Sequence, residues 1–251
     1  MRFAAVTATY AWLARRAFTH HVPLAVGLGY CSAVHAVVTS LVVADVAPWI
    51  IGKNPKTGQV PVWSWVVWGP FHLTNRFFVG VAKLNHSHAN NLEVATEVWP
   101  GWYLGGWYSS ELGIRFSAVV DLCCELPERA QTDRYMCCAN WDGMLHGEDI
   151  ARAAPFLAAA AKEGPVLVHC AHGVGRSTAT IVGKCAVARA APMPILLSIF
   201  MGLAGALVEA GHFSSTKAAF EHCKKMRPVV KQSSRLKGAL DSWEASRKSS
   251  Q

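Results

Sequence analysis

A stretch of nine residues, 169–177, carries the side chains best suited to chemistry in this 251-residue chain. It reads His-Cys-Ala-His-Gly-Val-Gly-Arg-Ser, so that five residues separate Cys170 from Arg176. The thiolate of Cys170 would be a strong nucleophile. The planar guanidinium of Arg176 can bind two phosphate oxygens at once, which a lysine cannot do. Ser177 can donate a hydrogen bond to the sulfur and help it leave as a thiolate.

The segments on either side predict how these residues are held. The apolar run 165–168 is typical of a buried parallel strand, and residues 178–190, rich in Ala and Val and without Pro, predict a helix. Cys170 would then stand on a tight turn in which Gly173 and Gly175 let successive amides point inward. Such a turn at a helix N-terminus binds a phosphate-sized anion and lowers the pKa of the thiol. The expected phosphate-binding residues are Ala171, His172, Gly173, Val174, Gly175 and Arg176.

This segment resembles the His-Cys-x5-Arg-Ser/Thr signature of the cysteine-dependent protein tyrosine phosphatase superfamily, and its brevity is similar to the dual-specificity branch. The resemblance covers about residues 92–246 and implies an α/β domain with a central, mainly parallel sheet flanked by helices. No metal or organic cofactor is expected, because arginine and backbone amides supply the positive potential.

The chain departs from the family pattern at two places. His172-Gly173 stands where many dual-specificity members have Ala-Gly, which leaves the anion-binding turn possible. Residues 191–211 form an apolar insertion where relatives have a short turn. The insertion could be a helix lying on a membrane, an additional core helix or an artefact of gene prediction.

The leaving oxygen of a phosphate ester needs a proton, so a general acid is also required. The family carries this acid on a loop ahead of the signature, and Asp142 stands at a matching place, 28 residues before Cys170 and after an expected strand at 135–139. The same residue would take a proton from the water that attacks the phosphocysteine. The competing carboxylates are Asp133, in an earlier loop, and Glu148 and Asp149, which suit the first turn of a helix.

The composition suggests membrane segments. Hydrophobic residues make up 52% of the chain, charged residues only 16%, and the mean hydropathy is +0.22. Residues 22–46 carry one charge, Asp45, and are long enough to span a bilayer. The tryptophan-rich segment 60–73 is either a second span or an interfacial helix. We therefore expect a leader at 1–21, a membrane region of one or two helices at 22–83, a linker at 84–91 and a tail at 247–251.

Charge and cysteine content limit the partners and the compartment. The net charge is +8, and residues 212–251 hold nine Lys and Arg against three Asp and Glu, which suits an anionic membrane surface. Neither a nucleic-acid motif nor the Cys-x2-Cys spacing of a zinc site is present, so neither partner is expected. A thiolate enzyme needs a reducing compartment, so we expect the catalytic domain to face the cytosol, with a mitochondrial location as the alternative.

Together these features predict a membrane-anchored phosphatase acting on phosphorylated protein at tyrosine, serine and threonine. A phosphoinositide or phosphatidylglycerophosphate lipid phosphatase is the first alternative, and a non-catalytic, phosphate-binding membrane scaffold is the second.

Two roles are open for Cys123 and Cys124. Either residue packs in a strand, or it forms a reversible disulfide with Cys170 after oxidation.

Overall fold

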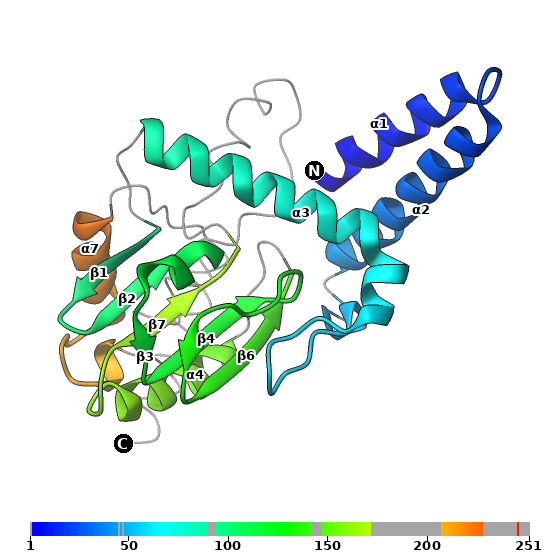
Figure 1. Cartoon of the computed structure of the whole chain (residues 1–251). Coiled ribbons are helices and arrows are strands. Elements are labelled where there is room, and N and C mark those ends of the chain that lie inside the picture. Colours follow the sequence, from blue (N-terminus) through cyan, green and yellow to red (C-terminus); the bar gives the residue numbers. More distant parts are fainter. Residues whose placement is uncertain are drawn as a thin grey trace.

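The computed structural model consists of N-terminal helices followed by an α/β domain (Figure 1). The residues that it describes are 2–44, 46, 48–89, 94–141, 147–171, 207–227 and 245. The expected signature residues after Ala171 and the expected acid Asp142 lie outside this set, whereas Cys170 lies within it.

The first two helices form an antiparallel hairpin that projects from the rest of the molecule (Figure 1). They are α1 (Arg2–Ala17) and α2 (Val22–Ala44), joined by hydrogen bonds such as the one from Ser32 Oγ to the Thr7 carbonyl at 3.1 Å. Of the helices that the structure describes, only α2 is long and apolar enough to cross a membrane. A signal sequence would pass the same test, but a core helix would be mostly buried, and only 17% of the apolar window of α2 is buried.

A short 3₁₀ helix, η1 (Pro48–Ile51), and a connector of residues 52–61 lead into α3 (Val62–Ala89). The helix is kinked at Trp68, where φ is −110° and ψ is 16°, two residues before Pro70. A proline cannot donate to the carbonyl four residues earlier, which here belongs to Val66. The hydroxyl of Tyr30 on α2 lies 2.7 Å from that carbonyl oxygen and supplies the missing donor. Tyr30 of α2 therefore contacts α3 directly at the kink.

One face of α3 packs against the α/β domain. Phe71 is in edge contact with Trp141, and His72 Nδ1 lies 3.1 Å from the Glu125 carbonyl oxygen. Asn75 is also buried, so this helix is held by protein contacts and not by lipid along that face. Among the described helices α3 is not a candidate span, and the interfacial alternative stays a prediction. Residues 84–89, expected as part of a linker, continue α3, because they contain neither Pro nor Gly.

The α/β domain is built on a five-stranded sheet in the order β1-β2-β7-β4-β6. Three of the four pairings are parallel and only β1 with β2 is antiparallel, so a mainly parallel sheet is confirmed. Its strands are β1 (Ala95–Trp99), β2 (Trp102–Gly105), β4 (Ala118–Cys123), β6 (Tyr135–Asn140) and β7 (Val166–His169). A separate small sheet pairs β3 (Arg115–Phe116) with β5 (Gln131–Thr132). A 3₁₀ helix, η2 (Trp107–Leu112), follows β2.

Two helices share the main hydrophobic core with one face of the sheet. They are α4 (Gly147–Ala160) and α7 (Thr216–Met226), which contribute Leu157 and Phe220 to the cluster that holds Val120 and Val168. The side chain of Ser215 caps α7 by accepting the Ala218 amide at 3.2 Å. Leu207 and Val208, near the end of the apolar insertion, are buried in this same core. The end of the insertion therefore belongs to the domain.

Candidate functional site

Cys170 is the first residue after the central strand β7. All four residues of β7 are buried, and the strand is paired in parallel on both sides, with β2 and with β4. The Cys170 amide donates to the Gly105 carbonyl at 3.4 Å, and the Ala171 carbonyl accepts the Trp107 amide at 3.1 Å. A Cβ at Gly105 would overlap Ser109 of η2 and Ala95 of β1, so the absence of a side chain lets these elements pack on the end of β2. The carboxyl end of β7 is thus fixed on two sides.

The other expected catalytic residues lie in stretches of the sequence between the described elements. Arg176, Ser177 and the expected phosphate-binding residues 172–175 lie outside the described residues, as does Asp142. Asp142 follows β6 in the sequence by two residues. Because β6 and β7 run parallel on either side of β4, their carboxyl ends lie at one edge of the sheet. The general-acid assignment therefore stays a prediction with a compatible strand arrangement.

The structure places the competing carboxylates in other roles. Asp133 precedes β6, at the opposite edge of the sheet from Cys170, and its side chain is exposed and paired with Arg115. Glu148 and Asp149 lie in the first turn of α4, as expected for acidic residues at a helix N-terminus. Asp149 also accepts a hydrogen bond of 3.0 Å from Asn140.

A buried cluster of charged residues, which sequence reasoning missed, lies beside the end of β7. Lys53 of the connector donates to Asp121 of β4 and, at 2.8 Å, to the Cys123 carbonyl. His169, in register with Asp121, has its Nε2 2.6 Å from Glu128 Oε2 and 3.9 Å from Asp121 Oδ1. We call Lys53, Asp121, Glu128 and His169 the charge cluster; each is less than 10% exposed.

The charges in this cluster stabilise one another. Burial lowers the pKa of His169, but the carboxylates of Glu128 and Asp121 raise it more, to about 9. Burial raises the pKa of Glu128, but His169 and the Ala130 amide lower it to about 2. Burial likewise opposes ionisation of Lys53, yet Asp121 raises its pKa overall. At neutral pH His169 and Glu128 are therefore both charged, beside the Lys53–Asp121 ion pair.

The sequence contained a weak signal for this cluster. Asp121 is the one ionisable carboxylate in an otherwise apolar strand, and a fully buried carboxylate requires a partner. The partner could not be identified, because Lys53 lies 68 residues earlier in a polar turn with nothing to distinguish it from Lys56.

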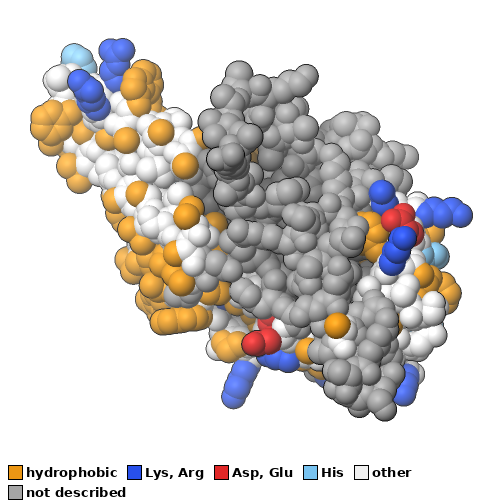
Figure 2. Space-filling view, turned by 180° about the vertical axis from the view of Figure 1, so that it is seen from behind, with side chains coloured by type: hydrophobic (Ala, Val, Ile, Leu, Met, Phe, Trp, Pro, Cys, Tyr) orange, Lys and Arg blue, Asp and Glu red, His pale blue; other side chains and the backbone are white. Residues whose placement is uncertain are grey.

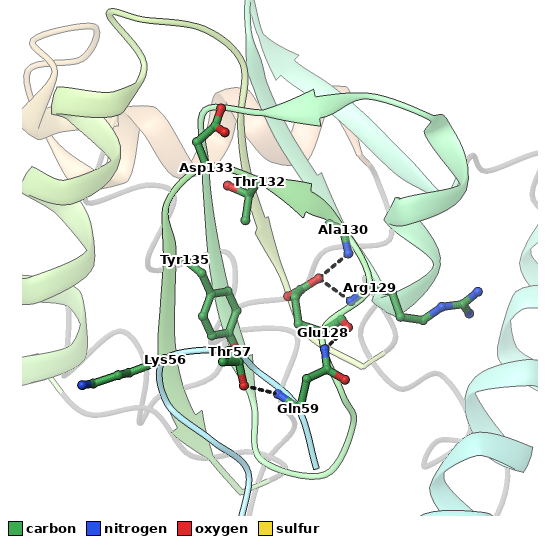
Figure 3. A pocket seen from close by; sticks show the side chains of 9 residues that line it. All are labelled: Lys56, Thr57, Gln59, Glu128, Arg129, Ala130, Thr132, Asp133 and Tyr135. Atoms are coloured by element: carbon green, nitrogen blue, oxygen red, sulfur yellow. Dashed lines mark hydrogen bonds between the residues drawn. The ribbon is translucent and has the colours of Figure 1, made fainter. Parts of the chain in front are cut away.

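A polar pocket of about 440 Å³ lies between the connector and the α/β domain (Figure 3). Glu128 is at its inner wall, where its Oε1 accepts the amides of Arg129 and Ala130 at 2.7 and 2.6 Å. The connector closes another side, with Gln59 Nε2 donating to the Glu128 carbonyl at 3.0 Å and the Glu128 amide donating to the Gly58 carbonyl at 2.9 Å. The connector is therefore bonded directly to the residue that holds His169.

Asp121, Cys123 and His169 have ligand atoms within 4.8 Å of one another, a spacing that could hold a metal ion. Two observations oppose that use. Asp121 Oδ2 accepts hydrogen bonds from Lys53 and, at 3.0 Å, from Tyr135, and His169 Nε2 is engaged by Glu128. The ammonium group of Lys53 occupies the position in which a cation would neutralise Asp121, so the donor set does not fit a metal.

Every cysteine within the described residues is a free thiol. Cys123 ends β4, next to β7, and burial followed by Asp121 and Glu125 raises its pKa well above the usual value, with a further contribution from Cys170. Cys123 is thus an unreactive, strand-packed thiol in this reduced state. A disulfide with Cys170 after oxidation stays a prediction.

Comparison with solved structures gives matches to dual-specificity phosphatases at low sequence identity. No protein-family model matches the sequence, and no curated protein matches it. A variant of human DUSP28 aligns over 64% of this chain and 100% of its own, with 15% identity and a TM-score of 0.48. A second structure of human DUSP28 aligns over 62% of this chain and 97% of its own, with 15% identity and a TM-score of 0.46. The human tyrosine phosphatase-like serine/threonine/tyrosine-interacting protein aligns over 60% of this chain and 95% of its own, with 17% identity and a TM-score of 0.43.

Proposed function

We propose that the chain is a membrane-anchored phosphatase that hydrolyses monoesters of phosphotyrosine, phosphoserine and phosphothreonine through a phosphocysteine intermediate. The observation that carries the proposal is the position of Cys170, directly after a central parallel strand and at the head of the Cys-x5-Arg-Ser sequence. A helix N-terminus after such a strand would direct backbone amides at a bound phosphate.

In the first step the Cys170 thiolate attacks phosphorus and the bond to the leaving oxygen breaks. Asp142 donates a proton to that oxygen, while Arg176 and the amides of residues 171–176 hold the equatorial oxygens. In the second step Asp142 takes a proton from a water that attacks phosphorus. The sulfur–phosphorus bond then breaks, which releases inorganic phosphate and restores the thiolate.

The membrane part of the proposal is supported by where apolar side chains are exposed. Among the described residues, every exposed large hydrophobic side chain except Met226 falls within residues 12–84. Figure 2 shows these side chains along the projecting hairpin, with basic side chains at its tip. The last turn of α1 supplies Arg15 and Arg16 there. Apolar flanks with cationic ends fit a bilayer with anionic head groups.

The same surface favours a second candidate substrate, a phosphomonoester on a lipid head group. An enzyme anchored by residues 12–84 would meet lipid substrates at high local concentration. Arg176 is, however, the only cationic Lys or Arg within residues 169–177, which gives little additional charge for a polyphosphorylated head group.

Purified full-length protein in anionic vesicles, assayed against a panel of substrates, tests the proposal. The panel contains phosphotyrosine, phosphoserine and phosphothreonine peptides, a phosphoinositide and phosphatidylglycerophosphate. We expect peptide turnover that falls at least about 10³-fold in Cys170→Ser and is unchanged in the control Cys31→Ser on α2. Fast lipid turnover with negligible peptide turnover would replace the substrate assignment. If no substrate releases phosphate, the enzyme assignment is wrong and the phosphate-binding scaffold becomes the supported function.

A further inference from the structure

The connector between the N-terminal helices and α3 places the buried ammonium group of Lys53 near the carboxyl end of β7, the strand that precedes Cys170. The side chain of Lys53 is 1% exposed and that of its partner Asp121 is fully buried. Asp121 Oδ1 also accepts the Cys123 amide at 2.9 Å, and Tyr135 donates to Oδ2. The carboxylate is therefore fixed in place, and Lys53 is the closest cation to it.

A chain of contacts leads from this ion pair to the peptide of Cys170. Asp121 Oδ1 lies 3.9 Å from His169 Nε2, which also faces Glu128. The other ring nitrogen of His169, Nδ1, lies 3.4 Å from the Cys170 carbonyl oxygen, to which a protonated imidazole can donate. The cluster thus ends at the residue expected to attack phosphorus.

We propose that Lys53 is a positioning residue for Cys170: its ammonium balances Asp121, so that no uncompensated carboxylate is left in the cluster that contacts the Cys170 peptide through His169 and the thiolate is not disfavoured. The proposal rests on the nucleophilic role proposed above for Cys170. Without the ammonium, one carboxylate would be left in excess within a buried, low-dielectric site. The added negative charge, transmitted through the His169–Cys170 contact, would oppose ionisation of the Cys170 thiol.

The titratable groups that face the cluster are known from every packed element of the described chain. They are Lys53 from the connector, Asp121 and Cys123 from β4, Cys124, Glu125 and Glu128 from the turn after β4, Tyr135 and Cys137 from β6, and His169 from β7. Burial raises the pKa of Cys137 to about 11 and, aided by Asp121, raises that of Tyr135 far above its usual value. Neither group changes charge near neutral pH, so the ionic balance is set by the four members of the charge cluster.

The pH dependence of Cys170 alkylation in the full-length protein tests this role. Iodoacetamide labelling is followed by peptide mass spectrometry, which reports Cys170 directly and needs no phosphatase activity. We expect Lys53→Met to move the midpoint of the labelling rate upward by about one pH unit. Lys53→Arg should restore the wild-type midpoint because it keeps the cation. The control Lys56→Met, in the same connector but exposed, should not move it.

A purely structural role would change the amount of folded protein and not this midpoint. Adding Asp121→Asn to Lys53→Met removes both charges and should return the midpoint toward the wild-type value. If Lys53→Met fails to fold, Asp121→Asn is compared with the Lys53→Met/Asp121→Asn double variant. Asp121→Asn keeps the ammonium of Lys53, so its labelling midpoint must be lower than that of the double variant. Equal midpoints in folded variants would overturn the proposal. A shifted midpoint in a protein that hydrolyses no phosphate ester would leave this role intact and overturn only the proposed function.

Discussion

At the scale of single residues, the proposed chemistry depends on a carboxylate that can move a proton at the carboxyl edge of the sheet. Asp142 follows β6, whereas Asp133 precedes it. We therefore expect Asp142→Asn to lower kcat for a phosphotyrosine peptide by about 10²- to 10⁴-fold. The loss should be smaller for an aryl phosphate with an acidic leaving group, because that oxygen departs without protonation.

Asp133→Asn is the matched control for this measurement. The side chain of Asp133 is more than half exposed and paired with Arg115, so its neutralisation should leave kcat unchanged. The reverse result, with Asp133→Asn inactive and Asp142→Asn active, would assign the general-acid role to Asp133.

Arg176 permits a second test at this scale, because its role depends on geometry as well as charge. Lysine keeps the positive charge but cannot form two parallel hydrogen bonds to a phosphoryl group. We expect Arg176→Lys to reduce kcat/KM by about 10²- to 10³-fold, since both substrate and transition state lose a bidentate contact. Steady-state kinetics together with circular dichroism separates this loss from unfolding. An active Arg176→Lys enzyme would show that charge alone is sufficient.

At the scale of elements, local patterns predicted the parallel sheet and α2 well and α3 poorly. The apolar run 165–168 predicted the buried parallel strand that is β7, and the strand expected at 135–139 is β6. The tryptophan-rich part of α3 was ambiguous, because an apolar face has the same sequence pattern whether it packs on protein or on lipid. The charge cluster depends on contacts between residues far apart in the chain, and no local pattern encodes such contacts.

The two faces of α3 can be distinguished by a pair of phenylalanines. Phe71 is 1% exposed and touches Trp141, whereas Phe77 is 66% exposed. Phe71→Ala should lower the free energy of unfolding by about 3 to 5 kcal/mol, because it leaves a cavity in packed protein. Phe77→Ala should leave it nearly unchanged and weaken binding to anionic vesicles. Denaturant unfolding and vesicle flotation measure the two effects, and equal effects of both variants on flotation would contradict the interfacial role of the outer face.

At the scale of the whole molecule, the N-terminal helices and the α/β domain share one folding unit. The cluster around Phe71 and Trp141 contains Val38 of α2 and Cys124 of the domain, and Trp141 Nε1 donates to the Val46 carbonyl at 2.7 Å. The connector adds the buried Lys53–Asp121 pair. The N-terminal helices are therefore bonded to the strands around Cys170, and unfolding should report both parts together.

The charge cluster gives this common folding unit a defined pH dependence. The pKa of His169 is about 9 in the folded chain, against 6.5 for an unperturbed histidine, so between these values the folded state binds a proton that the unfolded state has lost. Stability is then full below pH 6.5 and falls as pH rises toward 9, by up to about 3 kcal/mol. Glu128, with a pKa of about 2 against 4.5, acts in the opposite sense, so stability falls as pH drops from 4.5 toward 2.

Urea unfolding between pH 5 and pH 9.5 measures the alkaline part of this profile. Glu128→Gln removes the carboxylate that contributes most to the raised pKa of His169, so the decline above pH 6.5 should become much shallower, although the variant is less stable at pH 6. Glu163→Gln is the matched control, because Glu163 is an exposed partner of Arg134 and does not contact the cluster. It should keep the wild-type decline. A decline of equal slope in wild type and Glu128→Gln would mean that another group loses its proton there, and that the His169–Glu128 pair is not what couples folding to pH.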